Sequence, residues 1–279
     1  MQLSSTSTQR TYRHLRLAVI GAAVMTLVTL VVVTITVGPV SSLSALYYTP
    51  GGTAFTGALF GITLGLVALS GHSVEQVLLD IAAWFAALIA VLPTPIAARD
   101  APGVAGLCPD GTVCVPATAA AAATVGIVVV AVMGILTAIV AVWLAAVRHG
   151  ITAGVVVPAA VVAAVSIAFM VWLVAGQQAL LAIGHLVVTG VFFCIMIAVS
   201  AVSAITARAP WRALYIVVTV GMCVSLVYLA VVFFTHLSGA GAGQPWILFG
   251  EVALIVFFAV FWIGQTTQKW NELDPALSR

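Results

Sequence analysis

Residues 119–147 read AAAAATVGIVVVAVMGILTAIVAVWLAAV, from Ala119 to Val147, and contain no charged side chain. A helix needs about 20 residues to cross the hydrocarbon core of a bilayer. This stretch is therefore long enough to cross, and we expect it to tilt or to project beyond the core. The composition agrees, because 63% of the residues are hydrophobic and only 6% are charged, against roughly 25% charged residues in a soluble domain. The sequence predicts a polytopic α-helical membrane protein.

Breaks between the apolar runs divide the chain into eight predicted transmembrane helices, which form one all-α integral membrane bundle. Residues 1–16 are predicted to be an N-terminal arm, residues 17–265 the membrane domain and residues 266–279 a C-terminal tail. The first run is longer than the apolar core of a signal peptide and no A-x-A-like site follows it, so we expect it to be retained. The predicted helices are Leu17–Val37, Ala54–Ser70, Val77–Ile96, Ala119–Val147, Ile151–Ala175, Leu180–Thr206, Ala213–Phe234 and Trp246–Gln265.

Positive charge marks one side of the predicted bundle. Eight helices put both termini on the same side, and eight of the nine Lys and Arg residues then fall there, with Arg99 alone on the other. Because positively charged loops stay in the cytoplasm, both termini are predicted to be cytoplasmic and the loop Ala97–Thr118 external, in a bacterial cell membrane.

The net charge of +2 gives no indication of a nucleic-acid partner. The basic arm is expected to contact anionic lipid headgroups.

Two of the four cysteines, Cys108 and Cys114, flank a short segment of the predicted external loop. An oxidising compartment favours a disulfide between two cysteines at this spacing. A redox pair is the alternative, although the C-x-x-C spacing typical of such pairs is absent. Cys194 and Cys223 lie in predicted helices and are interpreted as small buried apolar residues. No combination of residues resembles a set of metal ligands.

Two ionisable side chains are predicted inside the membrane domain near its outer surface. Charges within membrane helices are costly and usually face the protein interior. At about 1.5 Å per residue, His185 and Glu251 each lie roughly 8–9 Å from the outer ends of their helices. Equal depth makes a pair possible, in which carboxylate and imidazole stabilise each other's charged forms. Such a pair could serve only to fix helix packing, or it could bind a ligand or handle protons.

Other polar side chains are predicted at the same outer level. Each of them alone is compatible with an interfacial anchor or a loop residue. Together they could line a cavity open to the outside, with the ionisable pair at its floor. The candidate ligand-binding set is His185, Glu251, Tyr47, Tyr48, Thr94 and His236.

A second polar cluster is predicted at the cytoplasmic face. It consists of Asp80, Glu75, His72 and Arg148, which lie at or near the cytoplasmic ends of three predicted helices. The alternative interpretation is a rim of solvated helix ends, in which Asp80 bonds to a basic neighbour.

Three sequence segments carry a family resemblance. They are SLSALYYTP at Ser42–Pro50, FTGAL at Phe55–Leu59 and LPT at Leu92–Thr94. They resemble a pattern in uncharacterised actinobacterial multi-pass membrane proteins, and the regions around His185 and from Glu251 to Trp270 are similar to the later helices of that group. The group is distantly similar to DRAM/Frag-like membrane proteins, which usually have six helices. The resemblance implies a fold and a habitat, and it implies no reaction.

Several enzyme classes lack the residues that they need. No two histidines stand in an H-x-x-x-H-like pair for a membrane zinc hydrolase, and no G-x-S-x-G context for a serine protease is evident. The sole lysine, Lys269, lies outside the last predicted helix, where it could not carry a retinal. Enzyme activity and a cofactor are therefore not expected.

The favoured function is to bind or handle a lipid-like or other apolar small molecule at the outer leaflet, because this needs only an apolar groove with a polar end. Gly57, Gly61 and Gly65 recur every four residues, which predicts close helix packing or a glycine face beside a ligand. One alternative is a transporter or channel that uses intramembrane Glu, His and Asp. Another is a structural or partner-stabilising membrane subunit. Membrane lipids are the expected partners, and protein partners are not indicated.

Overall fold

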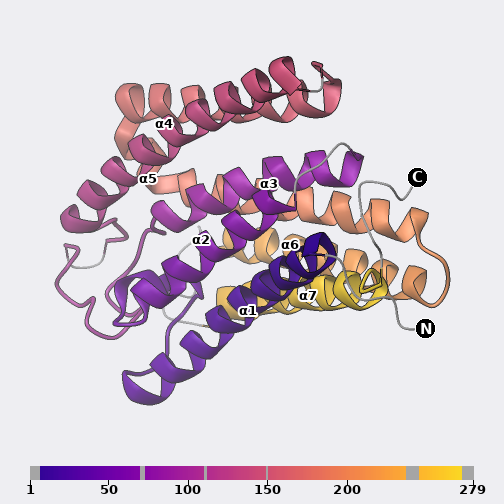
Figure 1. Cartoon of the computed structure of the whole chain (residues 1–279). Coiled ribbons are helices and arrows are strands. Elements are labelled where there is room, and N and C mark those ends of the chain that lie inside the picture. Colours follow the sequence, from indigo (N-terminus) through magenta and orange to yellow (C-terminus); the bar gives the residue numbers. More distant parts are fainter. Residues whose placement is uncertain (1–6, 70–72, 110–111, 149, 237–244, 272–279) are drawn as a thin grey trace.

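The computed structural model describes residues 7–69, 73–109, 112–148, 150–236 and 245–271. These residues form seven α-helices and one short 3-10 helix, and they contain no β-strand, only an isolated bridge between Ile96 and Cys114. The predicted all-α class is confirmed (Figure 1). The helices are α1 (Ser7–Thr36), η1 (Ser44–Tyr48), α2 (Gly52–Ala68), α3 (Val74–Val91), α4 (Ala117–Arg148), α5 (Ala153–Thr206), α6 (Trp211–His236) and α7 (Trp246–Gln268).

Among the described residues, six helices are long and apolar enough to cross a membrane, and α2, at 17 residues, is shorter. The two predicted helices Ile151–Ala175 and Leu180–Thr206 correspond to the two helical parts of α5, an element of 54 residues in which two helices meet at a kink. Its backbone leaves helical geometry at Gly176 (φ −162°, ψ 57°), and α5 turns back on itself within its length (Figure 1). The kink lies at this one residue, so the two parts follow each other without a separate loop.

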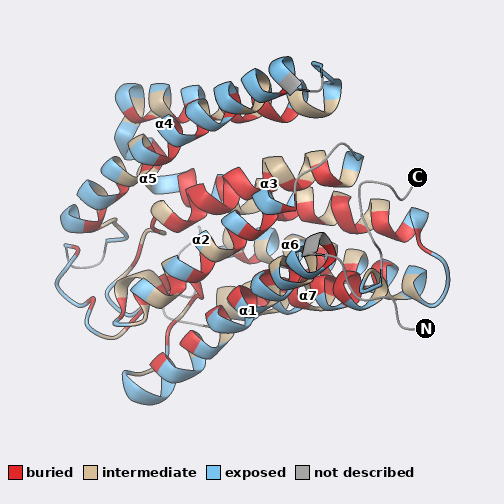
Figure 2. Cartoon of the chain, viewed as in Figure 1, coloured by how far each residue is buried: buried red, intermediate tan, exposed pale blue. Residues whose placement is uncertain are grey.

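Helix α3 lies in the centre of the molecule. Almost every residue from Ala82 to Ala90 is buried, on all sides of the helix, as expected for a helix that is apolar all round and enclosed by others. It packs against α2, α4 and α5. By contrast, α4 exposes large apolar side chains such as Leu136 and Trp143, and much of its surface is exposed in Figure 2. This surface suits contact with lipid, which agrees with a membrane protein.

The start of α1 and the end of α7 lie together. The Arg13 side chain donates a hydrogen bond to the Trp270 carbonyl (2.7 Å), and its guanidinium stacks 4.7 Å from the centre of the Trp270 ring. The α4–α5 and α5–α6 connections are at this same end, and η1 is at the opposite end (Figure 1). Helix α1 begins at Ser7, within the predicted arm, because Gln9 and three arginines extend the helix readily.

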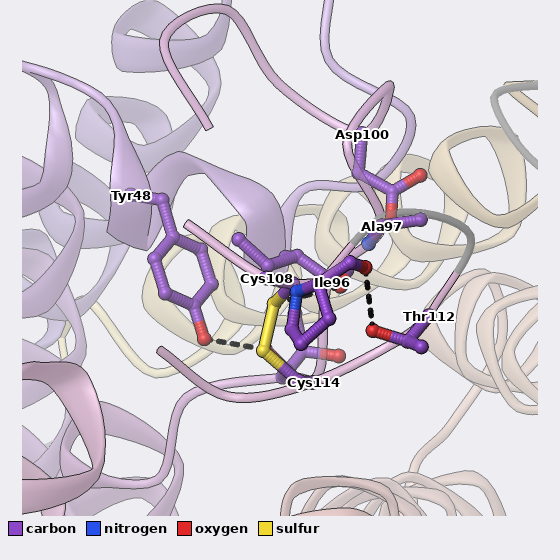
Figure 3. The surroundings of a disulfide bond; sticks show 9 residues. Tyr48, Ile96, Ala97, Asp100, Cys108, Thr112 and Cys114 are labelled. Carbon is purple, nitrogen blue, oxygen red and sulfur yellow. Dashed lines mark hydrogen bonds between the residues drawn. A yellow bond between two sulfur atoms is a disulfide. The ribbon is translucent and has the colours of Figure 1, made fainter. Parts of the chain in front are cut away.

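The predicted disulfide is present. The Cys108 and Cys114 sulfur atoms lie at bonding distance, with Cα atoms 5.8 Å apart. Two backbone hydrogen bonds pair Ile96 with Cys114, and the Asp100 carboxylate accepts one from the Ala97 N–H (2.7 Å). The loop after α3 therefore folds back on its own beginning, at the same end of the bundle as Tyr48 (Figure 3).

Candidate functional site

The segment between α1 and α2 folds into the bundle. It lies between the first two predicted helices, and the structure places the 3-10 helix η1 in it and buries Ser44, Ala45 and Leu46. The Ser42 hydroxyl accepts a hydrogen bond from the Ala45 N–H (3.0 Å) and so stabilises the first turn. A short helix leaves its first N–H groups without intrahelical partners. The Leu43 N–H, just before η1, is such a donor and is available to another element.

That donor meets Glu251 of α7. The Leu43 N–H donates to Glu251 Oε2 (2.5 Å), and the Ser44 hydroxyl lies 2.7 Å from Glu251 Oε1. The same Ser44 oxygen lies 2.8 Å from Nε2 of His185, on α5. His185 is buried, with 8% of its surface exposed, and Glu251 is partly buried. The hydroxyl of Ser44 thus stands between the carboxyl group and the imidazole, and we call these three residues the outer trio.

The other nitrogen of His185 is held by the end of α3. Nδ1–H donates to the Leu92 carbonyl (2.7 Å), which fixes both the ring orientation and the nitrogen that carries this proton, since a carbonyl can only accept. Leu92 precedes Pro93, and a residue before proline is driven out of the helical region. Its extended backbone (φ −95°, ψ 106°) ends α3 and leaves the carbonyl free for the imidazole. The sequence LPT therefore places one contact of the site.

An apolar cavity lies beneath the outer trio. Its volume is about 40 Å³, which is room for a few water molecules. Among the described residues that line it, His185 and Glu251 are the only ionisable ones. The buried Thr189 hydroxyl has no hydrogen-bond partner, so it is free to bond with an occupant. The lining residues are Thr26, Leu43, Ser44, Phe55, Leu59, Ile62, Ala86, Ile89, His185, Thr189, Phe192, Phe193, Glu251, Ile255 and Phe258.

Of the five predicted ligand-binding residues whose side chains are described, His185 and Glu251 line this cavity, and Tyr47, Tyr48 and Thr94 do not. Tyr48 and Thr94 do come together, because the Tyr48 phenol donates to the Thr94 carbonyl (2.6 Å). Burial raises the pKa of this phenol, so it donates as a neutral group. The Tyr47 ring packs edge-on against Tyr48, with centroids 5.2 Å apart. The sixth predicted residue, His236, ends α6, and its side chain lies outside the described part.

Glu75, one member of the predicted cytoplasmic cluster, contacts residues that the prediction did not name. Glu75 forms an ion pair with Lys269 (3.4 Å) and accepts a hydrogen bond from Ser203 (3.3 Å). The Gln265 amide donates to the same Ser203 hydroxyl (2.8 Å). These contacts join α3, α5 and α7, and we call the four residues the inner cluster. Of the other predicted members, Asp80 lies on α3, Arg148 ends α4 with its side chain outside the described part, and His72 lies outside the described residues.

Sequence reasoning did not select Ser44, Leu43 or Thr189. Ser44 belongs to the serine-rich segment that carries the family resemblance, which was the one available signal. The contacts of the Leu43 N–H depend on how η1 enters the bundle, and no residue pattern reports that. Comparison with protein-family models, curated proteins and solved structures finds no match. The site is therefore interpreted from its own geometry, as a buried polar trio at the end of an apolar cavity in a membrane protein.

Proposed function

We propose that this membrane protein binds a lipid-like or other mostly apolar small molecule at the outer leaflet, with the polar end of the molecule at the outer trio. One observation carries the proposal: a cavity lined by phenylalanine and aliphatic side chains ends at Ser44, His185 and Glu251. Binding sites for small molecules are commonly apolar with a few well-placed polar groups. The unpartnered hydroxyl of Thr189 adds bonding capacity on the wall of the same cavity.

The cavity must widen to accept more than a headgroup. Its volume of about 40 Å³ suits a few waters, whereas a chain of methylene groups needs several times that space. The buried rings of Phe192 and Phe258 pack as a tilted pair in the cavity lining, with centroids 5.9 Å apart, and they would have to part to admit such a chain. Rotation of these rings would lengthen the cavity towards the membrane centre. Ligand entry is therefore accompanied by repacking between α5 and α7.

The orientation follows from charge and helix length. At about 1.5 Å per residue, the parts of α5 before and after Gly176 are roughly 35 and 45 Å long, and each exceeds the thickness of about 30 Å of a hydrocarbon core. We infer that its two parts cross separately on either side of Gly176 and, with α2, make eight crossings. The arginines at the start of α1 and Lys269 at the end of α7 then mark the cytoplasmic side. The outer trio accordingly faces the outer leaflet of the cell membrane.

The proposal is tested by what copurifies with the protein from native membranes. Mass spectrometry of the purified protein should detect an apolar molecule at near-stoichiometric amount. Thr189→Val removes one cavity hydroxyl and nearly preserves shape. Loss of one hydrogen bond of about 0.5–1.5 kcal/mol should weaken binding about 2–10-fold. Thr266→Val is the matched control, since Thr266 is buried at the other end of α7. Absence of a ligand from the wild type, or equal retention in both variants, contradicts the proposal.

Transport is the second candidate, and one observation favours it. The part of α5 after Gly176 and helix α7 each carry polar residues near both ends, which are His185 and Glu251 in the outer trio and Ser203 and Gln265 in the inner cluster. On α7 the two levels are about 21 Å apart at 1.5 Å per residue. Buried apolar residues such as Phe258 and Phe261 occupy the interval. Transport would need these to part, and uptake of the copurified molecule into proteoliposomes would distinguish it from binding alone.

A further inference from the structure

The hydrogen bonds of the outer trio fix how many protons it holds. His185 Nδ1 must carry a proton, because its partner is the Leu92 carbonyl. The Ser44 hydroxyl owns one proton but has two neighbours that can accept it, Glu251 Oε1 at 2.7 Å and His185 Nε2 at 2.8 Å. If the carboxylate is ionised and the imidazole neutral, one of those acceptors is left without a donor. Leaving a buried polar group unpaired is costly.

One additional proton removes the mismatch, and it has two positions. With the proton on Glu251, the carboxyl group donates to Ser44 and the hydroxyl donates to the neutral imidazole. With the proton on His185 Nε2, the imidazolium donates to Ser44 and the hydroxyl donates to the carboxylate. Both arrangements pair every group and have no net charge, which suits a low-dielectric site. A second additional proton would leave the hydroxyl facing two donors and the site positively charged.

We propose that Glu251, Ser44 and His185 form a relay that holds one shared proton, with Ser44 as the bridge. In the transfer, the Glu251 O–H bond breaks as a new O–H bond forms on Ser44. The original Ser44 O–H bond breaks as an N–H bond forms on His185 Nε2. A carboxylate and an imidazolium result, no electrons are gained or lost, and the net charge stays zero. This relay goes beyond the proposed ligand binding and requires no ligand.

The surroundings leave Ser44 as the route to the imidazole. His185 is buried and its Nδ1 is occupied by Leu92, whereas Glu251 is partly exposed. Other titratable groups at this end of the bundle have hydrogen-bond or ring contacts of their own. From η1, Tyr48 donates to Thr94 (2.6 Å), and Tyr47 packs on the Tyr48 ring. From the disulfide loop, the Asp100 carboxylate accepts hydrogen bonds from Ser41 (2.8 Å) and Ala97 (2.7 Å).

Elements on the remaining sides add no titratable contact that is described at the trio. Helix α3 contributes the Leu92 carbonyl, and the charged groups Glu75 and Lys269 of α3 and α7 are at the opposite end of the bundle. Helix α6 presents Tyr228, which donates to the Trp246 carbonyl (3.2 Å). Helix α1 contributes Thr26 to the cavity wall.

The test measures both ends of the relay in the full-length protein in nanodiscs. Nitrogen-15 NMR of labelled histidines reports the protonated fraction of His185, assigned by His185→Gln. Infrared spectroscopy reports the protonated fraction of Glu251, assigned by Glu251→Gln. Between about pH 4 and 8, the range in which free glutamate and histidine titrate, the two fractions should sum to one at every pH. A sum near zero or near two at any pH in this range overturns the relay.

Three variants assign the bridge. Ser44→Thr keeps the hydroxyl and should preserve the sum, while Ser44→Ala should make the two fractions independent of each other. Retention of the sum in Ser44→Ala overturns the role of Ser44. If that variant fails to fold, the comparison of wild type with Ser44→Thr still decides, because a changed sum in Ser44→Thr also counts against the bridge. Thr189→Val should bind the ligand more weakly but keep the sum, so failure of the relay and failure of ligand binding are distinguished.

Discussion

Replacing Glu251 by Ala or by Gln separates the hydrogen bonds of this carboxyl group from its charge. Glu251 accepts the Leu43 N–H at 2.5 Å and lies 2.7 Å from the Ser44 hydroxyl. In Glu251→Ala, the Ser44 hydroxyl can still donate to His185, but the Leu43 N–H loses its partner. An unsatisfied buried N–H costs about 1–3 kcal/mol, so the free energy of unfolding should fall by about that amount.

Glu251→Gln should behave differently. The amide oxygen can accept the Leu43 N–H and the amide nitrogen can donate to Ser44, so both contacts survive and the trio remains neutral. We expect a loss below about 1 kcal/mol, within the range of a single altered hydrogen bond. At roughly 2–4 °C per kcal/mol for a chain of this size class, the Ala variant should melt about 2–12 °C lower than wild type, and the Gln variant should stay within a few degrees.

The assay is thermal unfolding of the detergent-solubilised protein, followed by tryptophan fluorescence at neutral pH. Equal melting temperatures for Glu251→Ala and wild type would show that the carboxyl group carries no structural hydrogen bond. Equal destabilisation in the Ala and Gln variants would refute the reasoning in another way, because it would mean that the negative charge matters and that hydrogen-bond geometry does not.

Three other predictions follow from single features. Gly65→Ala should lower the free energy of unfolding by about 1–3 kcal/mol through overpacking, because the added Cβ would clash with the side chain of Val19 on α1. Gly57→Ala should be near neutral in the same thermal scan, because no atom lies within 4 Å of its added Cβ. Intact mass after alkylation without reductant should show Cys108 and Cys114 unmodified, whereas two alkylated loop thiols would exclude the disulfide. Gly103→Cys, made after Cys108 and Cys114 are replaced by serine, should react with an impermeant thiol reagent in intact cells. Failure of this cysteine to react would mean that the loop faces the cytoplasm.

The helical segments and the ionisable pair could be predicted from sequence because each depends on local composition. Apolar runs identify membrane helices wherever they occur, and two ionisable groups in such runs stand out without any tertiary information. The equal depth assigned to His185 and Glu251 agrees with their shared contact to Ser44. The disulfide could likewise be predicted, from the spacing of Cys108 and Cys114 and from the oxidising compartment expected for their loop.

The rest depended on tertiary geometry. The segment Ser41–Thr53 has the polar composition of a loop, yet η1 enters the bundle and supplies the bridging hydroxyl. The partner of Glu75 is Lys269, 194 positions away along the chain, and no local pattern pairs α3 with the end of α7. The close packing predicted from the three glycines of α2 is present at two of them. Gly61 and Gly65 face α1, whereas Gly57 has no neighbouring atom within 4 Å of where a Cβ would lie.

The most direct test of the central claim is an experimental structure of the protein purified from native membranes without added lipid. Electron density should show an elongated molecule in the cavity, with its polar end within hydrogen-bond distance of Ser44 or Glu251 and its apolar part between the side chains of α5 and α7. Phe192 and Phe258 should have moved apart to admit it. A cavity that holds only water, with Phe192 and Phe258 still packed against each other and every bound molecule on the outer surface of the bundle, would contradict the account.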